Sequence, residues 1–411
     1  MVAIPAYELD LPMLDTAGLD RSEALEAASR AARQHWLART PLGFSLTGYQ
    51  DAVACLRDRR FHSALSLIPQ IAGIESGGYL DDRRRSILSM EGEEHTRLRR
   101  LVAPAFTPAA ADRLRPFMSE VMIGLVDRVS PVGHCDLVAD VCEPYPIPII
   151  CELLGAPKDD WKRFSDWATD IFRIFNQDLA VDLPAIERAS NELDDYVRTL
   201  VEQRRTQPGD DLLSCLIAIE ESGDRLSTDE MVMLAEAVLM AGTDTTRNQL
   251  ACFMALFAEH PHQWALLVDN PELVTSAVEE SMRYLGAVRG TARVASEDIE
   301  YRDVLFPKGT LVNVSLAASN RDPAAFGDPD KLDISRRPGT QHMTFGSGIH
   351  HCLGASLARA ELQEALRVLA HRMPTFALDG QVEWKPATFG IWGPSRLPLR
   401  FEPSSRLRPE P

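Results

Sequence analysis

Length, composition and charge exclude several classes of protein. The chain has 411 residues, 45% hydrophobic and 25% charged, as expected of a globular protein whose core can enclose a bulky group. Its net charge of -17 disfavours non-specific nucleic-acid binding, which requires basic surface. The N-terminus does not resemble a signal peptide, and no run of about 20 apolar residues predicts a membrane anchor. The seven cysteines form no C-x-x-C pair, which favours a reduced, cytoplasmic protein.

The predicted elements are mainly helices. Asp20 and Glu23 resemble a capping box that opens a helix to about Leu37. Short β-type runs occur at residues 44–46 and 311–316, whereas residues 118–285 are nearly all helix-like. We see no repeat or flexible linker. We therefore expect one domain over residues 1–411, mainly α with small β-sheets, whose ends (1–20 and 403–411) are peripheral or frayed.

The most informative helix is predicted to begin after Ser227. Ser227 and Glu230 form a second capping-box pattern, and the helix is expected to run to about Glu259, before His260-Pro261. Its first half, MVMLAEAVLM, is apolar on nearly every face. This pattern is typical of a helix buried in a large core.

Polar residues interrupt this helix at Ala241-Gly242-Thr243-Asp244-Thr245-Thr246. A glycine inside a helix costs about 1 kcal/mol relative to alanine, and an unpaired buried carboxylate costs several. The segment could be a polar patch at a helix–helix contact, with hydroxyls bonded to carbonyls one turn back. It could instead form a groove for a small ligand, in which Asp244 and Thr245 pass protons onward.

A glycine-rich segment precedes a strongly helical stretch near the C-terminus, and reads Phe345-Gly346-Ser347-Gly348-Ile349-His350-His351-Cys352-Leu353-Gly354. The glycines allow a sharp turn and close approach to a flat ligand. Cys352 would lie just before a helix N-terminus, which stabilises a thiolate. An ordinary buried thiol, a partial zinc site and a Cys–His nucleophile stay open as alternatives. Zinc needs further ligands, however, and adjacent side chains rarely point at each other.

Two shorter patterns are ambiguous by themselves. Glu280 and Arg283 share one face of a predicted helix, as many exposed ion pairs do. His95 and Arg99 also share a face, and could clamp an anionic group or belong to a basic surface helix.

Together these segments resemble the bacterial cytochromes P450. Residues 345–354 resemble the haem-binding signature of that family, residues 241–246 its oxygen-binding segment, and Glu280 with Arg283 its E-x-x-R motif. Their order and spacing also fit, and the resemblance extends over residues 40–402. It departs at residues 90–94, where many relatives have an acidic residue and two prolines. That departure concerns the local loop and not the haem clamp.

The resemblance implies a cytochrome P450 fold, a triangular prism with haem b between the central helix and the helix that follows the cysteine ligand. It makes Cys352 the iron ligand and Asp244 with Thr245 the acid–alcohol pair that delivers protons. The other cofactor-binding residues that it implies are His95, Arg99, Arg293 and His350 for the propionates, Ala241 and Gly242 for dioxygen, and Phe345, Gly346 and Gly354 in the loop. Glu280, Arg283 and Arg336 would form a buried charge network that supports the loop.

The implied activity is that of a haem-thiolate monooxygenase that hydroxylates or epoxidises an apolar small molecule with dioxygen. The expected pocket wall consists of Leu234, Ala237, Val238 and Ala241, which share the Thr245 face of the helix, and of Ala287, Val288, Thr291 and Ile391 by resemblance. Arg289 lies among them, either facing solvent or meeting a substrate carboxylate. A peroxide-driven peroxygenase and a haem-binding sensor without turnover are the alternatives, and the acid–alcohol pair argues against both.

The electrons are expected to come from another protein, because the chain has no flavin- or nicotinamide-binding segment. The resemblance implies NAD(P)H, a ferredoxin reductase and a small acidic iron–sulfur ferredoxin. We expect Arg97, Arg100 and Arg359 to form a basic patch on the Cys352 side that orients this partner. The chain is expected to act as a monomer.

Overall fold

The molecule is mainly helical, as predicted, with its strands in small sheets. The computed structural model describes residues 3–16, 18–19, 21–67, 70, 84–175, 179–221, 226–337, 339–386 and 391–403. The helices are α1 (Arg21–Gln34), α2 (Tyr49–Arg57), α5 (Gly92–Val102), α6 (Pro108–Val129), α7 (Pro146–Leu154), α8 (Trp161–Ile171), α9 (Leu179–Thr206), α10 (Leu212–Glu221), α11 (Thr228–Glu259), α12 (Pro261–Asp269), α13 (Val274–Tyr284), α14 (Leu316–Ser319) and α15 (Ala355–Arg372). The strands are β1 (Ile4–Pro5), β2 (Leu37–Thr40), β3 (Gly43–Leu46), β4 (Phe61–Ser63), β5 (His134–Asp136), β6 (Gly290–Ala295), β7 (Ile299–Tyr301), β8 (Val304–Phe306), β9 (Leu311–Ser315), β10 (Phe376–Leu378), β11 (Glu383–Trp384), β12 (Pro394–Arg396) and β13 (Pro398–Phe401).

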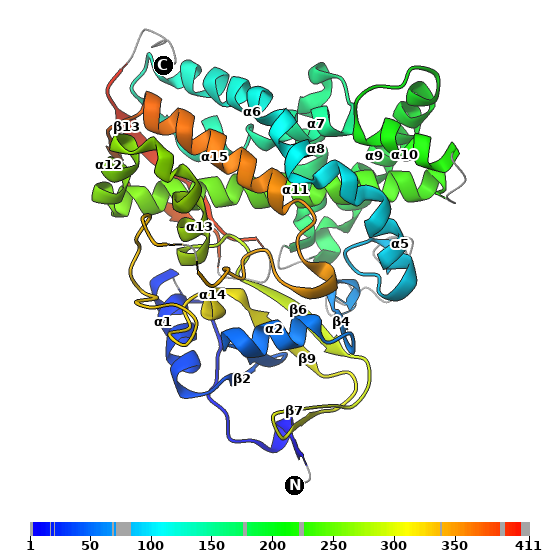
Figure 1. Ribbon diagram of the computed structural model, residues 1–411, viewed down its shortest axis with the longest axis vertical. Coiled ribbons are helices and arrows are strands. Elements are labelled where there is room, and N and C mark those ends of the chain that lie inside the picture. Colours follow the sequence, from blue (N-terminus) through cyan, green and yellow to red (C-terminus); the bar gives the residue numbers. More distant parts are fainter. Residues whose placement is uncertain are drawn as a thin grey trace.

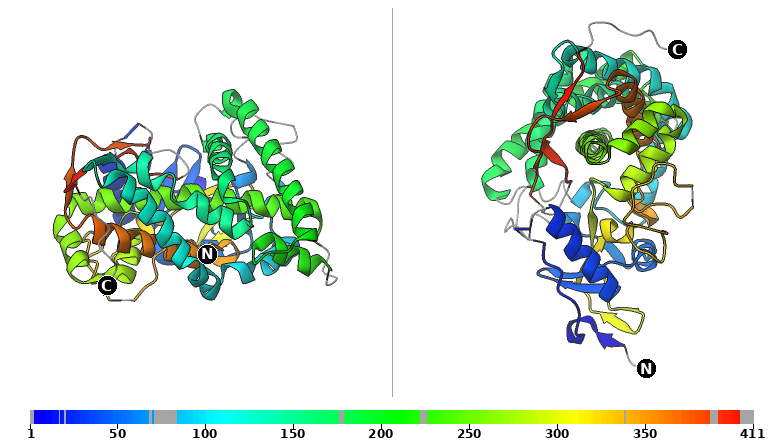
Figure 2. Two further views of the ribbon diagram at one scale, coloured as in Figure 1. Left: turned by 90° about the horizontal axis from the view of Figure 1, so that it is seen from above. Right: turned by 90° about the vertical axis from the view of Figure 1, so that its left-hand side faces the viewer.

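Helix α11 crosses the middle of the molecule (Figure 1). The right-hand view of Figure 2 shows it nearly end-on, with other elements around it. Both halves of the predicted capping box are present, since the Ser227 hydroxyl accepts from the Glu230 amide and the Glu230 carboxylate accepts from the Ser227 amide. Its apolar first half is buried in the main hydrophobic core, together with residues of α6, α7 and α15. The predicted start, end and burial of this helix are therefore confirmed.

The largest sheet lies on the opposite side of the molecule from α6 and α15, beside α1, α2 and α14 (Figure 1). Its strand order is β2-β3-β9-β6-β4, so the two β-type runs predicted from the sequence are neighbours, and Phe44 pairs with Val312. Strand β4 pairs with β6 and places Ser63 opposite Arg293. This pairing brings an early segment of the chain to a predicted site residue.

Some predicted boundaries differ from the structure. The first helix ends at Gln34, before the predicted Leu37, because Leu37 starts β2 and pairs with Leu46. Asp20, the predicted cap of that helix, lies outside the described residues. The short strand β5 interrupts the helical stretch 118–285, where it pairs with β13.

Strand β13, close to the last described residue, lies at the periphery (Figure 1). Strand β1 pairs in parallel with β8, so residues 4–5 are ordered by the backbone of a distant segment. Residues 404–411 lie outside the described part of the chain. None of the helices that the structure describes is long and apolar enough to cross a membrane.

Candidate active site

The segment before Cys352 forms a tight turn that packs against α2. The Cys352 amide donates to the Phe345 carbonyl at 2.9 Å, and the Gly346 amide donates to the Met343 carbonyl at 2.7 Å. Gly348 has a φ of +71°, and a Cβ there would lie 1.9 Å from the Leu56 carbonyl oxygen. Only glycine fits this turn, which places the Cys352 sulfur just before the N-terminus of α15.

The surroundings of the Cys352 thiol include two cationic side chains. Burial raises the pKa of the thiol, while a hydrogen bond with the Gly354 backbone and the charges of Arg99 and Arg359 oppose that rise. The described residues contain no group of three or more His, Cys, Asp or Glu side chains able to hold a metal ion. The partial zinc site left open by the sequence therefore gains no further ligands, and Cys352 stands as a lone thiol donor.

Helix α5 carries the buried His95, whose ring nitrogen Nε2 has no hydrogen-bond partner among the described residues. His95 is only 1% exposed, and its Nε2 atom makes no hydrogen bond within the described residues. Burial and the nearby His350 and Arg99 lower the pKa of His95 to about 4, so its ring is neutral near pH 7. An unpaired buried ring nitrogen is costly unless a ligand completes its hydrogen bonding.

The predicted propionate-binding residues gather around His95. Its ring lies 4.6 Å from that of His350, and the Arg99 guanidinium donates to the His351 carbonyl. Arg293 on β6 is buried and donates to the Thr291 hydroxyl and the Ala292 carbonyl. A lone thiol, an unpartnered histidine nitrogen and two half-buried or buried arginines fit a flat ligand that carries carboxylates, such as the haem implied by the resemblance.

Glu91 is a site residue that the sequence did not reveal. Its Oε1 atom lies 3.0 Å from His350 Nε2 and accepts from the Ser63 amide at 2.6 Å. Burial would raise the pKa of Glu91, but these two hydrogen bonds lower it. Glu91 belongs to residues 90–94, where the chain departs from the family pattern. The acidic residue just before α5 was the available signal.

The polar interruption of α11 combines both interpretations of the sequence. The Thr245 hydroxyl donates to the Ala241 carbonyl at 2.6 Å, and the Thr243 hydroxyl donates to the Leu239 carbonyl at 2.8 Å. Ala241 is nevertheless exposed, although the residues before it are buried, so this part of the helix borders an accessible space. Gly242 faces α7 instead, and a Cβ there would lie 2.4 Å from Cδ1 of Ile150.

The Asp244 carboxylate is buried and surrounded by donors. Arg247 Nε donates to its Oδ1 atom at 2.5 Å, and Asn248 Nδ2 donates to the same atom at 3.0 Å. Lys385 Nζ lies 3.9 Å from Oδ1. The burial penalty of an ionised carboxylate in the core is therefore offset by two cations and an amide.

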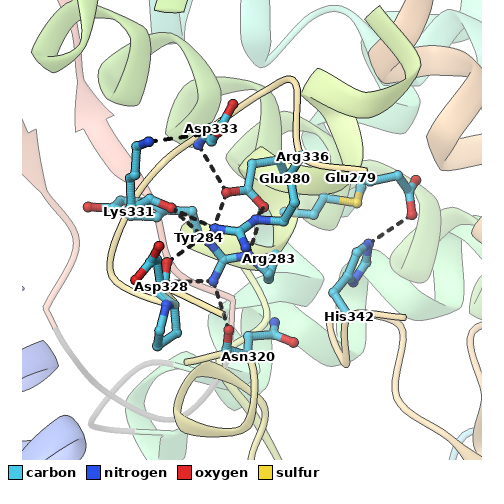
Figure 3. A network of polar contacts seen from close by, with 12 residues as sticks. Glu279, Glu280, Arg283, Tyr284, Asn320, Asp328, Lys331, Asp333, Arg336 and His342 are labelled. Carbon is cyan, nitrogen blue, oxygen red and sulfur yellow. Dashed lines mark hydrogen bonds and ion pairs between the residues drawn. The ribbon is translucent and has the colours of Figure 1, made fainter. Parts of the chain in front are cut away.

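The predicted charge network is assembled at the end of α13 (Figure 3). Arg283 donates to both carboxylate oxygens of Glu280, at 2.7 and 2.8 Å, and both side chains are 3% exposed. Arg336 donates to Glu280 at 3.0 Å. The two arginines also donate to the carbonyls of Asn320, Gly327, Asp328, Pro329 and Lys331. The network thereby ties α13 to the irregular segment that leads to the Cys352 loop.

A second ionic cluster adjoins this network and was not expected. Glu279 accepts from Arg359 at 2.7 and 3.0 Å and lies 3.2 Å from His342 Nε2 (Figure 3). Burial would raise the pKa of Glu279, but His342 and Arg359 lower it to about 2. Arg359 also lies over the Phe345 ring, at 4.5 Å. It is thus held within the structure and does not simply point outward.

The predicted pocket wall is only partly accessible. Leu234, Ala237 and Ala287 are buried, and Val238 is at the limit of burial, whereas Ala241 is exposed. The remaining wall residues, Val288, Thr291 and Ile391, are half-buried, and Val288 pairs with Ile391 through an isolated β-bridge. The accessible wall thus lies on the Ala241 turn of α11 and on the segments after α13 and at the C-terminal hairpin.

Glu361 on α15 is a second residue that the sequence did not single out. It is 1% exposed, and burial raises the pKa of its carboxyl to about 8, against a smaller effect of Thr246 on α11. The carboxyl is therefore largely protonated at neutral pH. Nothing in the helical sequence around Glu361 distinguishes it from an exposed glutamate.

An open cavity of about 690 Å³ lies beside the Cys352 loop. Its lining includes Ile349 of the loop together with Arg59, His62, Arg97 and Arg100. Glu91 and Glu93 also border it. Basic side chains from β4 and α5 and their flanks thus meet at one surface.

Comparisons with known proteins identify the family. The family described as Cytochrome P450 matches residues 158–379. Luteothin monooxygenase of Streptomyces thioluteus is 35% identical, and the match covers 95% of this chain and 96% of that protein. Mycinamicin IV hydroxylase/epoxidase of Micromonospora griseorubida is 39% identical, and the match covers 88% of this chain and 91% of that protein. The crystal structure of CalO2 superposes with a TM-score of 0.88 at 29% identity, over 94% of this chain and 98% of that one.

Proposed function

This chain belongs to the cytochrome P450 family and is a monooxygenase that hydroxylates or epoxidises a small molecule, and from this premise we propose that its substrate is mainly apolar and that Cys352 is its haem ligand. The observation that carries the proposal is the Cys352 thiol, on which the charge of Arg99 acts, combined with the unpartnered Nε2 atom of His95 one turn before Arg99 on α5. A lone thiol with an adjacent carboxylate-binding cluster suits haem and does not suit zinc. Bound there, haem would supply the activation of dioxygen, from which the inserted oxygen atom comes.

The residues of the site divide the work of binding haem. Cys352 would supply the sulfur that holds the haem iron, and Arg99 and Arg359 favour its ionised form through their charge. His95 would complete its hydrogen bonding with a propionate, and the neighbouring Arg99 and Arg293 would balance the propionate charge. Glu280, Arg283 and Arg336 would hold the chain that leads to the loop, because the two arginines donate to its carbonyls and Glu280 accepts from the Asp333 amide.

Asp244 and Thr245 are proposed to deliver protons to the reaction. The carboxylate is buried next to the accessible turn at Ala241, and the Thr245 hydroxyl bonds the Ala241 carbonyl. The Thr245 hydroxyl can accept a proton and pass one on, while the Asp244 carboxylate can be reprotonated through its polar neighbours. A buried acid next to a hydroxyl is what a dioxygen-using enzyme needs and what a peroxide-using one does not.

The substrate is proposed to be mainly apolar. The accessible wall contains Ala241, Val288 and Ile391, with the Thr291 hydroxyl already accepting from Arg293. Arg289 lies over the Trp392 ring at 4.9 Å, an arrangement that favours a structural role over the binding of a substrate carboxylate. The names of the relatives, which describe oxygenation of small molecules, support the same class of substrate.

The electron donor is proposed to be a small acidic iron–sulfur ferredoxin, supplied from NAD(P)H by a reductase. The docking face that we propose keeps Arg100 of the three predicted arginines and adds Arg59. Both side chains are exposed and line the cavity beside Ile349, whereas Arg97 is half-buried and Arg359 does not line this cavity. We therefore place docking at Arg59 and Arg100, which suit an acidic partner despite the net charge of -17.

Product formation with different electron sources tests the proposed function. The protein is incubated with a library of apolar molecules and either a ferredoxin, its reductase and NADPH, or hydrogen peroxide alone. We expect products with the protein donors, and far fewer with peroxide. Products with peroxide only would favour a peroxygenase, and haem binding without product in either case would favour a sensor.

The remaining proposals concern the chain as a whole. We propose that it is a single domain, because the main core includes residues from α5 to β13, and that it acts as a monomer. All seven cysteines are free thiols, which supports the proposal of a reducing, cytoplasmic location.

A further inference from the structure

The C-terminal hairpin reaches the buried acid of α11. Lys385 follows β11, and its Nζ atom lies 3.9 Å from Oδ1 of Asp244. Arg247 and Asn248 bond the same oxygen from one turn along α11. Within the described residues no hydrogen bond ends on Oδ2 of Asp244. The hydrogen bonds therefore hold one oxygen and leave the other for proton transfer.

Contacts within the C-terminal hairpin hold the backbone of Lys385 in place. Its backbone amide donates to the Gly393 carbonyl at 3.1 Å, and its carbonyl accepts from Trp392 Nε1 at 2.8 Å. The rings of Trp384 and Trp392 are stacked at 4.6 Å. These contacts fix the backbone from which the Lys385 side chain extends.

The same hairpin is pressed closely against α11. A Cβ on Gly393 would lie 2.9 Å from Oδ1 of Asn248, the residue that also bonds Asp244. The backbone amide of Trp392 donates to the Ala287 carbonyl at 2.9 Å, and Ile391 pairs with Val288. The hairpin thus connects the accessible pocket wall to the buried acid through a few short contacts.

The ammonium group is placed where its charge acts strongly. Lys385 is half-buried, and burial lowers its pKa while the charge of Asp244 opposes that change. A partly desolvated cation interacts more strongly with a carboxylate than an exposed one does. The free-energy cost of desolvating the Lys385 ammonium is offset by its attraction to the Asp244 carboxylate, whereas a fully exposed lysine would have no such cost to offset.

We propose that Lys385 is a positioning residue that, together with Arg247, holds Oδ1 of Asp244 so that Oδ2 is presented for proton delivery. This inference rests on the proposed role of Asp244 and Thr245 in delivering protons. Because Lys385 and the wall residue Ile391 belong to the same hairpin, the orientation of the acid depends on the segment that borders the substrate.

The test compares Lys385→Met, which keeps the length of the side chain and removes its charge, with Lys385→Arg, which keeps the charge. Lys308→Met is the matched control, because Lys308 is exposed at the turn before β9. Asp244→Asn serves as the reference for loss of the acid. Crystal structures give the orientation of Asp244, and reductant consumption by the haem-loaded enzyme with a ferredoxin system is measured in H2O and D2O.

In Lys385→Met we expect the Asp244 carboxylate to turn away from its parental orientation. Reductant consumption should fall about tenfold, less than the hundredfold that a misplacement of about 1 Å can cost, with a larger solvent isotope effect. Lys385→Arg should restore most of the rate, Lys308→Met should match the parent, and Lys385→Met should add nothing in the Asp244→Asn background.

Two negative results are distinguishable. An unmoved Asp244 and a parental isotope effect in Lys385→Met, with a clear defect in Asp244→Asn, would overturn the role of Lys385 alone. A parental rate and isotope effect in Asp244→Asn would instead overturn the proposed proton path, and the role of Lys385 with it.

Discussion

The Thr245 hydroxyl donates a hydrogen bond to the Ala241 carbonyl, and the preceding residue, Asp244, carries a buried carboxylate. Thr245→Ala removes the hydroxyl while leaving the helix and the Asp244 contacts in place. We expect reductant to be consumed but diverted to peroxide, with roughly tenfold less product per electron pair, a smaller loss than the roughly 10²- to 10⁴-fold that general acid–base catalysis contributes, because Asp244 remains. Product, peroxide and NADPH are measured together.

The conservative variant Thr245→Ser is the control for Thr245→Ala. It keeps a hydroxyl one turn from the Ala241 carbonyl and should retain most of the parental coupling. Parental coupling in Thr245→Ala itself would remove this residue from the proton path.

Glu361 gives a stability prediction with a definite sign. Burial raises the pKa of its carboxyl from 4.5 to about 8, so the folded chain keeps a proton that the unfolded chain releases. This contribution to stability is fully present below pH 4.5 and is lost as the pH rises toward about 8. The loss amounts to at most about 1.4 kcal/mol per pH unit.

Glu361→Gln removes the titrating group and keeps its shape. Urea unfolding of parent and variant between pH 5 and 9, in roughly unit steps, should show the variant gaining stability relative to the parent as the pH rises. A difference between the two proteins that does not depend on pH would mean that Glu361 is not protonated in the folded state.

Residues whose role depends on neighbours in the chain were predictable from the sequence. Cys352 lies in a glycine-rich turn before a helix, and Asp244 interrupts an apolar helix, so local pattern marked both as candidates and the family resemblance implied their roles. Glu361 and Lys385 gave no such signal, and the acidic character of Glu91 did not reveal its contact with His350, because each of the three is placed by a distant segment. Only the packed structure brings these pairs together.

At the scale of elements, the buried pair Glu280–Arg283 looks in the sequence like any exposed helical pair. Its burial follows from the segment 320–336, which surrounds it and offers carbonyls to both arginines. The long capped helix α11 was predicted correctly because its caps and its apolar faces are local features. The end of α1 was predicted too late, because pairing with β3 draws Leu37 into a strand.

The network of Figure 3 is expected to be a major contributor to folding. Arg283→Leu leaves the Glu280 carboxylate buried without its bidentate partner and should cost on the order of 3–5 kcal/mol. The exposed pair Arg30–Glu26 on α1 is the comparison, and Arg30→Ala should cost less than about 1 kcal/mol. Chemical unfolding of both variants gives the two values.

Equal and small losses for the two variants would show that the buried network is not structurally demanding. Arg336→Leu should fall between them, because Arg336 is more exposed and Glu280 would still bond Arg283. Haem content, measured on each variant, reports whether the weakened segment disturbs the Cys352 loop.

At the scale of the whole molecule, a chain of net charge -17 repels an acidic partner except where basic residues gather. Arg59→Glu with Arg100→Glu reverses the exposed cations beside the Cys352 loop. We expect slower reduction by ferredoxin, roughly tenfold at low ionic strength and much less at high salt, with apolar ligands binding as before.

Two exposed arginines that do not line this cavity, Arg188 on α9 and Arg396 on β12, provide a variant with the same change in net charge. If Arg188→Glu with Arg396→Glu slows reduction as much, the effect comes from net charge and not from a docking face. Stopped-flow reduction at several salt concentrations separates the two.

The identity of the iron ligand is the central claim, and the spectrum of the reduced carbon monoxide complex tests it most directly. The parent should show the thiolate-type spectrum, and Cys352→Ala should lose it in protein that still folds. Cys215→Ala and Cys252→Ala should keep it, since one thiol is exposed and the other bonds the Trp392 carbonyl. A thiolate-type spectrum in folded Cys352→Ala would contradict the account.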